Sequence, residues 1–203
     1  MPEHLHGDHA NESFAKLDLY GEAFGADRYV DCSFVDADLT EASASGTVFE
    51  QCDFSGTKLN AASLHAVAFL RCRFRGASLF AATLRDCKLT GSVFERTVLR
   101  PLTIEGGDWS YVALRRADLV AVDLAGVRLT EADLTDADLS RASLRDCDLT
   151  RARLDKAVLR ETDLRGAQLD GVALADLQLD RTVIDLDQAV LFATARGAVV
   201  RAG

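Results

Sequence analysis

The sequence predicts an elongated all-β repeat fold, and three regularities support that prediction. One apolar residue returns every five residues from Phe14 to Ile184, in a series of 35 members that includes 22 Leu and 8 Phe. A period of five fits neither an α-helix nor a β-strand, so it indicates a repeat architecture. The position two residues before each member is usually Ala, Cys, Val, Thr or Ser. This alternation predicts a narrow interior filled by large and small side chains.

The third regularity is a 20-residue spacing of like side chains. Residues 14, 34, 54, 74 and 94 are all Phe, and residues 19, 39, 59 and onward to 179 are all Leu. Equivalent side chains would stack in this way if each turn of the chain took 20 residues and successive turns lay at the spacing of neighbouring strands. The repeat then makes roughly nine turns and a rod roughly 42 Å long, at about 4.8 Å per turn.

The repeating unit resembles the pentapeptide-repeat family, whose pattern is A(D/N)LXX. The unit Ala132-Asp133-Leu134-Thr135-Asp136 is an example. The resemblance implies an all-β, right-handed quadrilateral β-helix with one pentapeptide on each side of each turn. We expect a disordered leader at residues 1–11, the β-helix at residues 12–184 and a C-terminal capping and dimerisation segment at residues 185–203.

A short helix is expected in that last segment, between Asp187 as N-cap and Gly197 as the residue after its end. The helix would be apolar nearly all round, whereas a helix that caps a rod needs only one apolar face. An isologous homodimer would cover the second face and shield the last β edge. We therefore predict a dimer interface at Ala189, Val190, Leu191, Phe192 and Ala193.

Pro101 interrupts the repeat near its middle. Proline removes a backbone donor and restricts φ, so we expect the rod to kink or bulge there. The five-residue register nevertheless continues through Leu99, Ile104 and Trp109.

No pattern in the sequence indicates catalysis, a cofactor or a metal. The cysteines fall on the small inward position, and we interpret them as buried apolar residues of a reducing compartment: Cys32, Cys52, Cys72, Cys87 and Cys147. His4, His6 and His9 precede the repeat, and a disordered leader explains them better than a metal tract. There is no nucleophile–base pair and no phosphate-binding glycine loop, so we predict that the protein is not an enzyme.

The sequence contains no apolar run of about 18 residues and no signal peptide, so we expect a cytoplasmic protein with no membrane partner.

Two segments resemble one branch of the family, the mycobacterial fluoroquinolone-resistance proteins and their Qnr relatives. They are Ser92-Val93-Phe94 with Leu99-Arg100-Pro101-Leu102-Thr103, and the tail from Asp185 through Asp187-Gln188-Ala189-Val190 to Phe192-Ala193. The resemblance implies a rod-shaped dimer that mimics B-form DNA and binds DNA gyrase. Such a protein inhibits supercoiling and protects the enzyme from fluoroquinolones.

The charge of the chain suits this role in part. The net charge is −9, so we expect attraction to a DNA-binding groove and no direct binding of nucleic acid. We predict a gyrase-binding acidic surface at Asp118, Asp123, Glu131, Asp133, Asp136 and Asp138. Residues 54–100, however, carry 8 bases against 2 acids. Gyrase contact is then either confined to the acidic centre, or this basic stretch meets an acidic gyrase surface. The alternative function is a passive protein–protein interaction scaffold of unknown partner.

Overall fold

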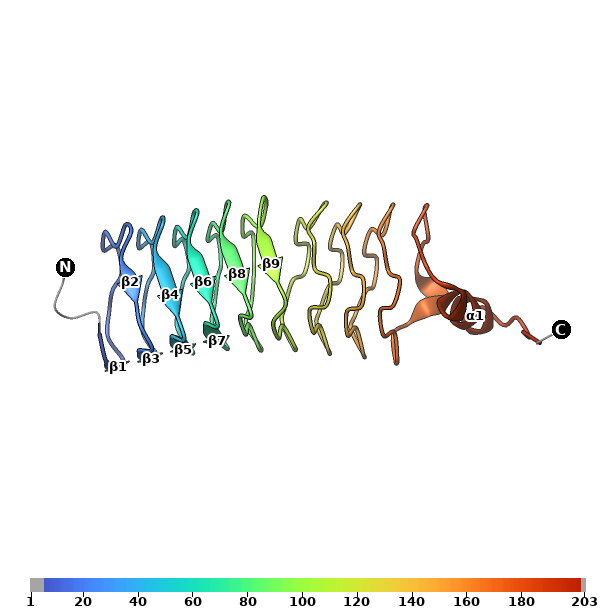
Figure 1. The fold of residues 1–203 in the computed structure, drawn as a ribbon, viewed down its shortest axis with the longest axis horizontal. Helices are drawn as coiled ribbons and strands as arrows, with labels where there is room; N and C mark the ends of the chain where they lie inside the picture. Colours follow the sequence, from blue (N-terminus) through green and yellow to red (C-terminus); the bar gives the residue numbers. More distant parts are fainter. Residues whose placement is uncertain (1–5, 202–203) are drawn as a thin grey trace.

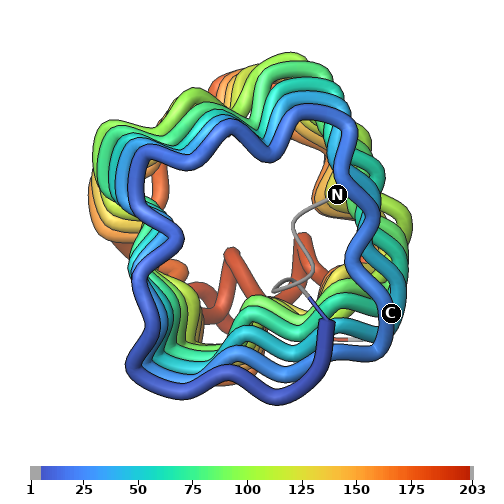
Figure 2. Tube along the Cα trace, turned by 90° about the vertical axis from the view of Figure 1, so that its left-hand side faces the viewer, coloured from blue at the N-terminus to red at the C-terminus, as the bar shows by residue number. Residues whose placement is uncertain are grey.

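A computed structural model describes residues 6–201, which wind into a right-handed, four-sided β-helix closed at one end by a helix (Figures 1 and 2). Every pairing between turns is parallel and joins residues 20 apart, from Asp8↔Arg28 to Asp163↔Val183. This offset confirms the 20-residue turn and the predicted fold class. None of the helices in the described part is long and apolar enough to cross a membrane.

Short strands on two sides of the rod form two parallel sheets in its N-terminal half. One sheet has the order β1-β3-β5-β7 and the other the order β2-β4-β6-β8-β9. The first contains β1 (Asp8–Ala10), β3 (Arg28–Val30), β5 (Val48–Glu50) and β7 (Ala68–Leu70). The second contains β2 (Ala23–Phe24), β4 (Ser43–Ser45), β6 (Ser63–His65), β8 (Thr83–Arg85) and β9 (Thr103–Glu105). Beyond β9, single parallel bridges join the turns. The 3₁₀-helix η1 (Leu174–Asp176) and the helix α1 (Leu186–Ala195) end the chain.

We number the four sides of the rod in chain order. Side 1 contains residues 12–16, side 2 residues 17–21, side 3 residues 22–26 and side 4 residues 27–31, and each side recurs every 20 residues. In most five-residue units the first and third side chains point inward and the other three face outward; the first residues of the earliest units, such as Leu17, are exposed. The fifth residue turns the corner in the left-handed region, as at Glu131 with φ 55°.

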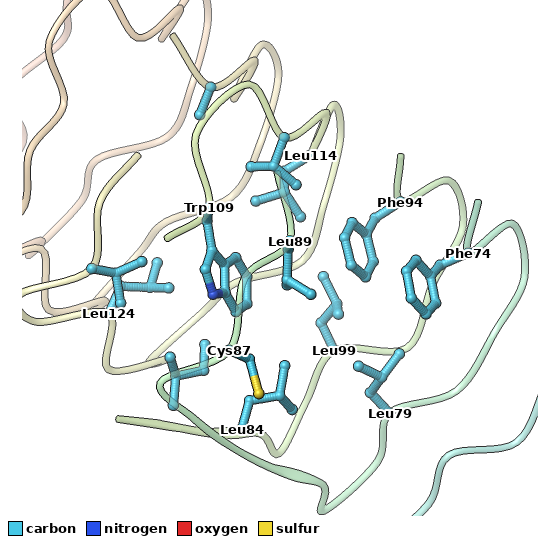
Figure 3. Packing of buried hydrophobic residues seen from close by; sticks show 14 of the residues in the cluster. Phe74, Leu79, Leu84, Cys87, Leu89, Phe94, Leu99, Trp109, Leu114 and Leu124 are labelled. Atoms are coloured by element: carbon cyan, nitrogen blue, oxygen red, sulfur yellow. The ribbon is translucent and has the colours of Figure 1, made fainter. Parts of the chain in front are cut away.

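The interior is a continuous stack of apolar side chains (Figure 3). On side 1 the rings of Phe34 and Phe54 lie parallel with centroids 4.9 Å apart, and those of Phe74 and Phe94 with centroids 4.6 Å apart. Parallel rings at this distance are what the 20-residue series predicts. All five cysteines are free and buried, which confirms them as small interior residues.

The β-helix begins earlier than the sequence predicted, so the disordered leader is wrong for residues 8–10. These residues form β1, which pairs with β3. His9 lies five residues before Phe14, in the phase of the apolar series. Its ring points inward and stacks on Tyr29 with centroids 4.8 Å apart. The predicted leader residues 1–5, including His4, lie outside the described residues.

The pairing between turns is interrupted at Pro101. On side 2 the bridges Ser78↔Val98 and Asp118↔Asp138 form, but no hydrogen bond or bridge of the described backbone joins Val98 to Asp118. Side 3 has the same gap between residues 103 and 123, whereas sides 1 and 4 stay paired through Val93↔Ala113 and Lys88↔Asp108. The turns therefore separate on two sides only, at the position where the sequence predicts a kink.

Candidate functional site

The six carboxylates predicted to contact gyrase do not form one surface. Residues five apart lie on neighbouring sides of the rod, and only residues 20 apart stack. The structure brings together Asp118 and Asp138, which pair as neighbours on side 2. The other four are placed on three different sides: Asp123 on side 3, Glu131 on side 4, and Asp133 and Asp136 on side 1. The prediction of a single acidic surface is therefore wrong.

The aspartates at the second position of the unit have a structural role. One carboxylate oxygen of each accepts a hydrogen bond from the backbone N–H two residues later, which holds the chain between its inward residue and the corner. The N–O distance is 2.9 Å from Ser140 to Asp138, 3.3 Å from Val120 to Asp118 and 3.1 Å from Thr135 to Asp133. The other oxygen, Oδ2, is the one that pairs with arginine at Asp118 and Asp133.

Ion pairs compensate four of the six carboxylates. Arg100 pairs with Asp118, and Arg115 lies 3.1 Å from Asp133. Burial would raise the pKa of Asp133, but hydrogen bonds from Thr135 and Arg115 hold that pKa below its ordinary value. The remaining pairs are Arg116–Asp136 at 3.7 Å and Arg151–Glu131 at 3.1 Å. Within residues 6–201, Asp123 and Asp138 have no such cation.

Side 2 combines acidic and apolar groups on one surface. Seven large apolar side chains before residue 186 are exposed in the described chain, and five of them lie on this side: Leu17, Tyr20, Phe80, Val98 and Val158. The exposed fraction of Phe80 is 51%. Val98 and Val158 occupy the same unit position as Asp118 and Asp138 and lie one turn before and one turn after them, so we take side 2 as the candidate functional site.

A hollow at the interruption near Pro101 lies at the edge of this surface. Its volume is about 450 Å³, and it is lined by Arg100, Pro101, Leu102, Val120, Ala121 and Val122. The Arg100 guanidinium spans the separated turns, because it pairs with Asp118 and donates to the Val120 carbonyl at 3.4 Å. The sequence indicated the interruption at Pro101. A second signal for this hollow, which the prediction did not use, is the presence of apolar residues at the outward positions Val98 and Val120.

The C-terminal helix α1 closes the last turn with one face. Its N-cap is Asp185, not Asp187 as predicted. The Asp185 carboxylate accepts from the Gln188 backbone N–H at 2.9 Å, and the Gln188 side chain accepts from the Asp185 N–H at 3.1 Å. Gln188 also donates to the carbonyls of Leu164 at 2.6 Å and Ala167 at 3.0 Å. These bonds attach the helix to the rod.

Because α1 packs on the rod with one face, some residues of the predicted dimer interface are buried in their own chain and others remain exposed. Phe192 is only 3% exposed because it packs into its own chain's core, so its placement in a dimer interface is wrong. Ala189 and Ala193 are half-buried. Val190 and Leu191 remain exposed, at 43% and 48%, together with Leu186 at the start of the helix.

Acidification is expected to loosen α1. The backbone N–H groups of Gln188 and Gly166 hold the pKa of Asp185 below its ordinary value. A depressed pKa in the folded state means that the cap stabilises the protein above about pH 4 and that this stabilisation is lost as the pH falls through the depressed pKa. Hydrogen exchange of the α1 amides should show reduced protection at about pH 2.5 relative to about pH 5. In Asp185→Ser, an uncharged cap, the pH dependence should be weaker; an equal loss of protection in both proteins would contradict this role.

Family models identify the repeat. Residues 24–92 match the model described as "Pentapeptide repeat region". Residues 105–136, 113–151, 137–175 and 147–183 match the model described as "Pentapeptide repeats (8 copies)". The chain belongs to the pentapeptide-repeat family.

Solved structures extend the comparison over the whole pentapeptide-repeat protein. A trypsin-treated form of QnrB1, a plasmid-mediated fluoroquinolone resistance protein, is similar with a TM-score of 0.73 and 21% identity, over 98% of this chain and 99% of that chain. Full-length QnrB1 has a TM-score of 0.64 and 20% identity, over 96% and 99%. A search of curated proteins found no significant match. The likeness to QnrB1 establishes the shared fold.

The repeat models describe a structural family and name no reaction. In residues 6–201 of this pentapeptide-repeat protein, no three His, Cys, Asp or Glu side chains converge as a metal site. Burial raises the pKa of the Cys87 thiol to about 11 and that of Cys147 to about 12. A buried thiol of high pKa is a poor nucleophile.

Proposed function

We propose that this protein binds DNA gyrase as a mimic of DNA, modulates or inhibits its supercoiling and protects it from fluoroquinolones. The sequence resemblance to the Qnr-like branch supports this role, and so does a fold shared with QnrB1 along the whole chain. Gyrase is a cytoplasmic enzyme, so we place this protein in the cytoplasm.

The observation that carries the proposal is a pair of stacked carboxylates on side 2, of which Asp118 pairs with Arg100 and Asp138 has no ion pair with any described residue. Asp118 and Asp138 occupy successive turns, which are separated by about 4.8 Å. This rise is of the same order as the axial spacing of about 3.4 Å between phosphates of one DNA strand. The neighbouring apolar groups, Val98 and Phe80, would add short-range contacts to the electrostatic attraction.

We also propose that a second copy of the chain covers the exposed part of α1. The apolar groups of Leu186, Val190 and Leu191 would then lie in an isologous interface. The dimer would be on the order of 85 Å long, comparable with about 25 base pairs. A second copy would thus extend the DNA-like surface.

The double variant Asp118→Asn/Asp138→Asn tests the role of side 2. Asparagine keeps the oxygen that accepts from the backbone N–H and removes the charge, so the fold should be retained. We expect binding to purified gyrase to weaken about tenfold or more, as measured by biolayer interferometry at two salt concentrations.

The matched control is Asp108→Asn/Asp148→Asn on side 4. These aspartates accept the same hydrogen bond, at 3.0 Å from Ser110 and 3.0 Å from Thr150. The control changes net charge equally and should bind gyrase nearly as well as the unmodified protein. Equal losses in both variants would contradict a specific role for side 2, and no binding by the unmodified protein would favour the passive scaffold.

A further inference from the structure

Side 1 carries a cluster of five exposed arginines over three successive turns. We call it the arginine patch; its members are Arg73, Arg75, Arg96, Arg115 and Arg116. The other outward residues of side 1 in these turns are Gly76, Val93, Glu95 and Ala113. Five cations therefore surround one carboxylate, in a protein whose net charge is −9.

Three of these arginines are not compensated by any residue that the structure describes. Arg115 and Arg116 pair with Asp133 and Asp136 in the following turn. The side chains of Arg73, Arg75 and Arg96 have no ion pair or hydrogen bond with any described residue. Since acids outnumber bases 32 to 23 in the chain, three adjacent unpaired guanidiniums are not a consequence of scarce carboxylates.

The ends of the patch limit the size of an anionic partner. Among the residues that stack with Arg73 at intervals of 20, Asp53 lies one turn before Arg73 and Asp133 lies three turns after it. The patch therefore spans about 10 Å along the rod, at about 4.8 Å per turn. Asp133 is paired with Arg115 and Arg153, whereas Asp53 has no ion pair with a described residue. A continuous polyanion such as a nucleic acid would extend over Asp53 and be repelled, whereas an extended segment of about three to four residues fits the patch.

We propose that the arginine patch docks a short acidic segment of a partner protein. Guanidiniums bind carboxylates through paired, charge-assisted hydrogen bonds, and three unpaired groups offer several such contacts. The proposal is independent of gyrase binding, because it concerns a different side of the rod.

Charge reversal tests the patch with a defined probe. We would measure fluorescence anisotropy of fluorescein-labelled tetraglutamate at low ionic strength, with Arg73→Asp/Arg75→Glu/Arg96→Glu as the variant. We expect the unmodified protein to bind the probe and the variant to bind it at least about tenfold more weakly. Each introduced residue already occurs at the same position of another five-residue unit: aspartate at the position of Arg73 in Asp53, and glutamate at the positions of Arg75 and Arg96 in Glu95 and Glu131.

The matched control reverses three unpaired cations that lie apart from one another. Lys16→Glu/Arg141→Glu/Lys156→Glu has the same net charge as the test variant and should retain probe binding to within about twofold. If the reversed patch fails to fold by circular dichroism, Arg73→Gln/Arg75→Gln/Arg96→Gln serves in its place. No binding by the unmodified protein, or an equal loss in the control, would overturn the proposal. Tighter binding of a single-stranded oligonucleotide with four phosphates would overturn the assignment to an acidic protein segment.

Discussion

Replacing Gly107 by alanine is expected to lower the free energy of unfolding by about 3 kcal/mol. Gly107 has a φ of +107°, and a Cβ there would lie 3.2 Å from the Cys87 backbone N and still closer to the Cys87 carbonyl oxygen. Both obstacles are backbone atoms of the preceding turn, so no side chain can move aside. The neighbouring indole of Trp109, 1% exposed, fills the interior beside it (Figure 3).

The control for this prediction is Gly126→Ala, measured in the same denaturant titration. Gly126 is a corner residue with φ +71°, and a Cβ there meets nothing within 4 Å. Alanine occupies the same kind of corner at Ala121 with φ 58°. We expect a loss of about 1 kcal/mol in this control. A Gly107→Ala protein as stable as the control would show that the two turns can separate at little cost.

Replacing Leu191 by aspartate is expected to convert the proposed dimer to a monomer without unfolding it. Leu191 is 48% exposed on α1, so a carboxylate is tolerated in the free chain. In an apolar interface the same carboxylate would be desolvated without a partner, at a cost of several kcal/mol. Light scattering after size exclusion would measure the mass, and supercoiling assays should show weaker inhibition by the monomer.

Phe192→Ala separates dimerisation from folding. Phe192 packs inside its own protomer, so its truncation should cost about 3 kcal/mol of stability. The exposed face of α1 keeps its chemistry, and the folded fraction should still dimerise. A Leu191→Asp protein that remains a dimer would rule out this face as the interface.

The fold could be predicted from the sequence because the repeat is strictly local and periodic. Each unit places its residues identically, so the phase of Phe14, Leu19 and their successors determines which side chains are buried. The same phase places His9 in the interior. Extending the five-residue series by one unit before Phe14 would therefore have predicted β1. The corner at Pro101 could be located, but the separation of turns on only two sides depends on pairing that no local pattern reports.

The candidate site was harder to predict because its residues are related by 20 positions and not by proximity in the sequence. Asp133 and Asp138 are close in the chain but lie on different sides, whereas Asp118 and Asp138 are neighbours in space. The burial of Phe192 was missed for another reason. Gln188, one turn earlier on the same helix face, looks like a solvent-facing residue, yet its amide is buried and bonds to two carbonyls of the rod.

The most direct test of the central claim is a supercoiling assay with purified gyrase from the same organism, titrated with this protein with and without a fluoroquinolone. We expect inhibition of supercoiling, or rescue of gyrase from drug-trapped cleavage, and a weaker effect of Asp118→Asn/Asp138→Asn. An absence of any effect at many-fold excess of the unmodified protein would contradict the gyrase assignment and leave a β-helical scaffold for another partner.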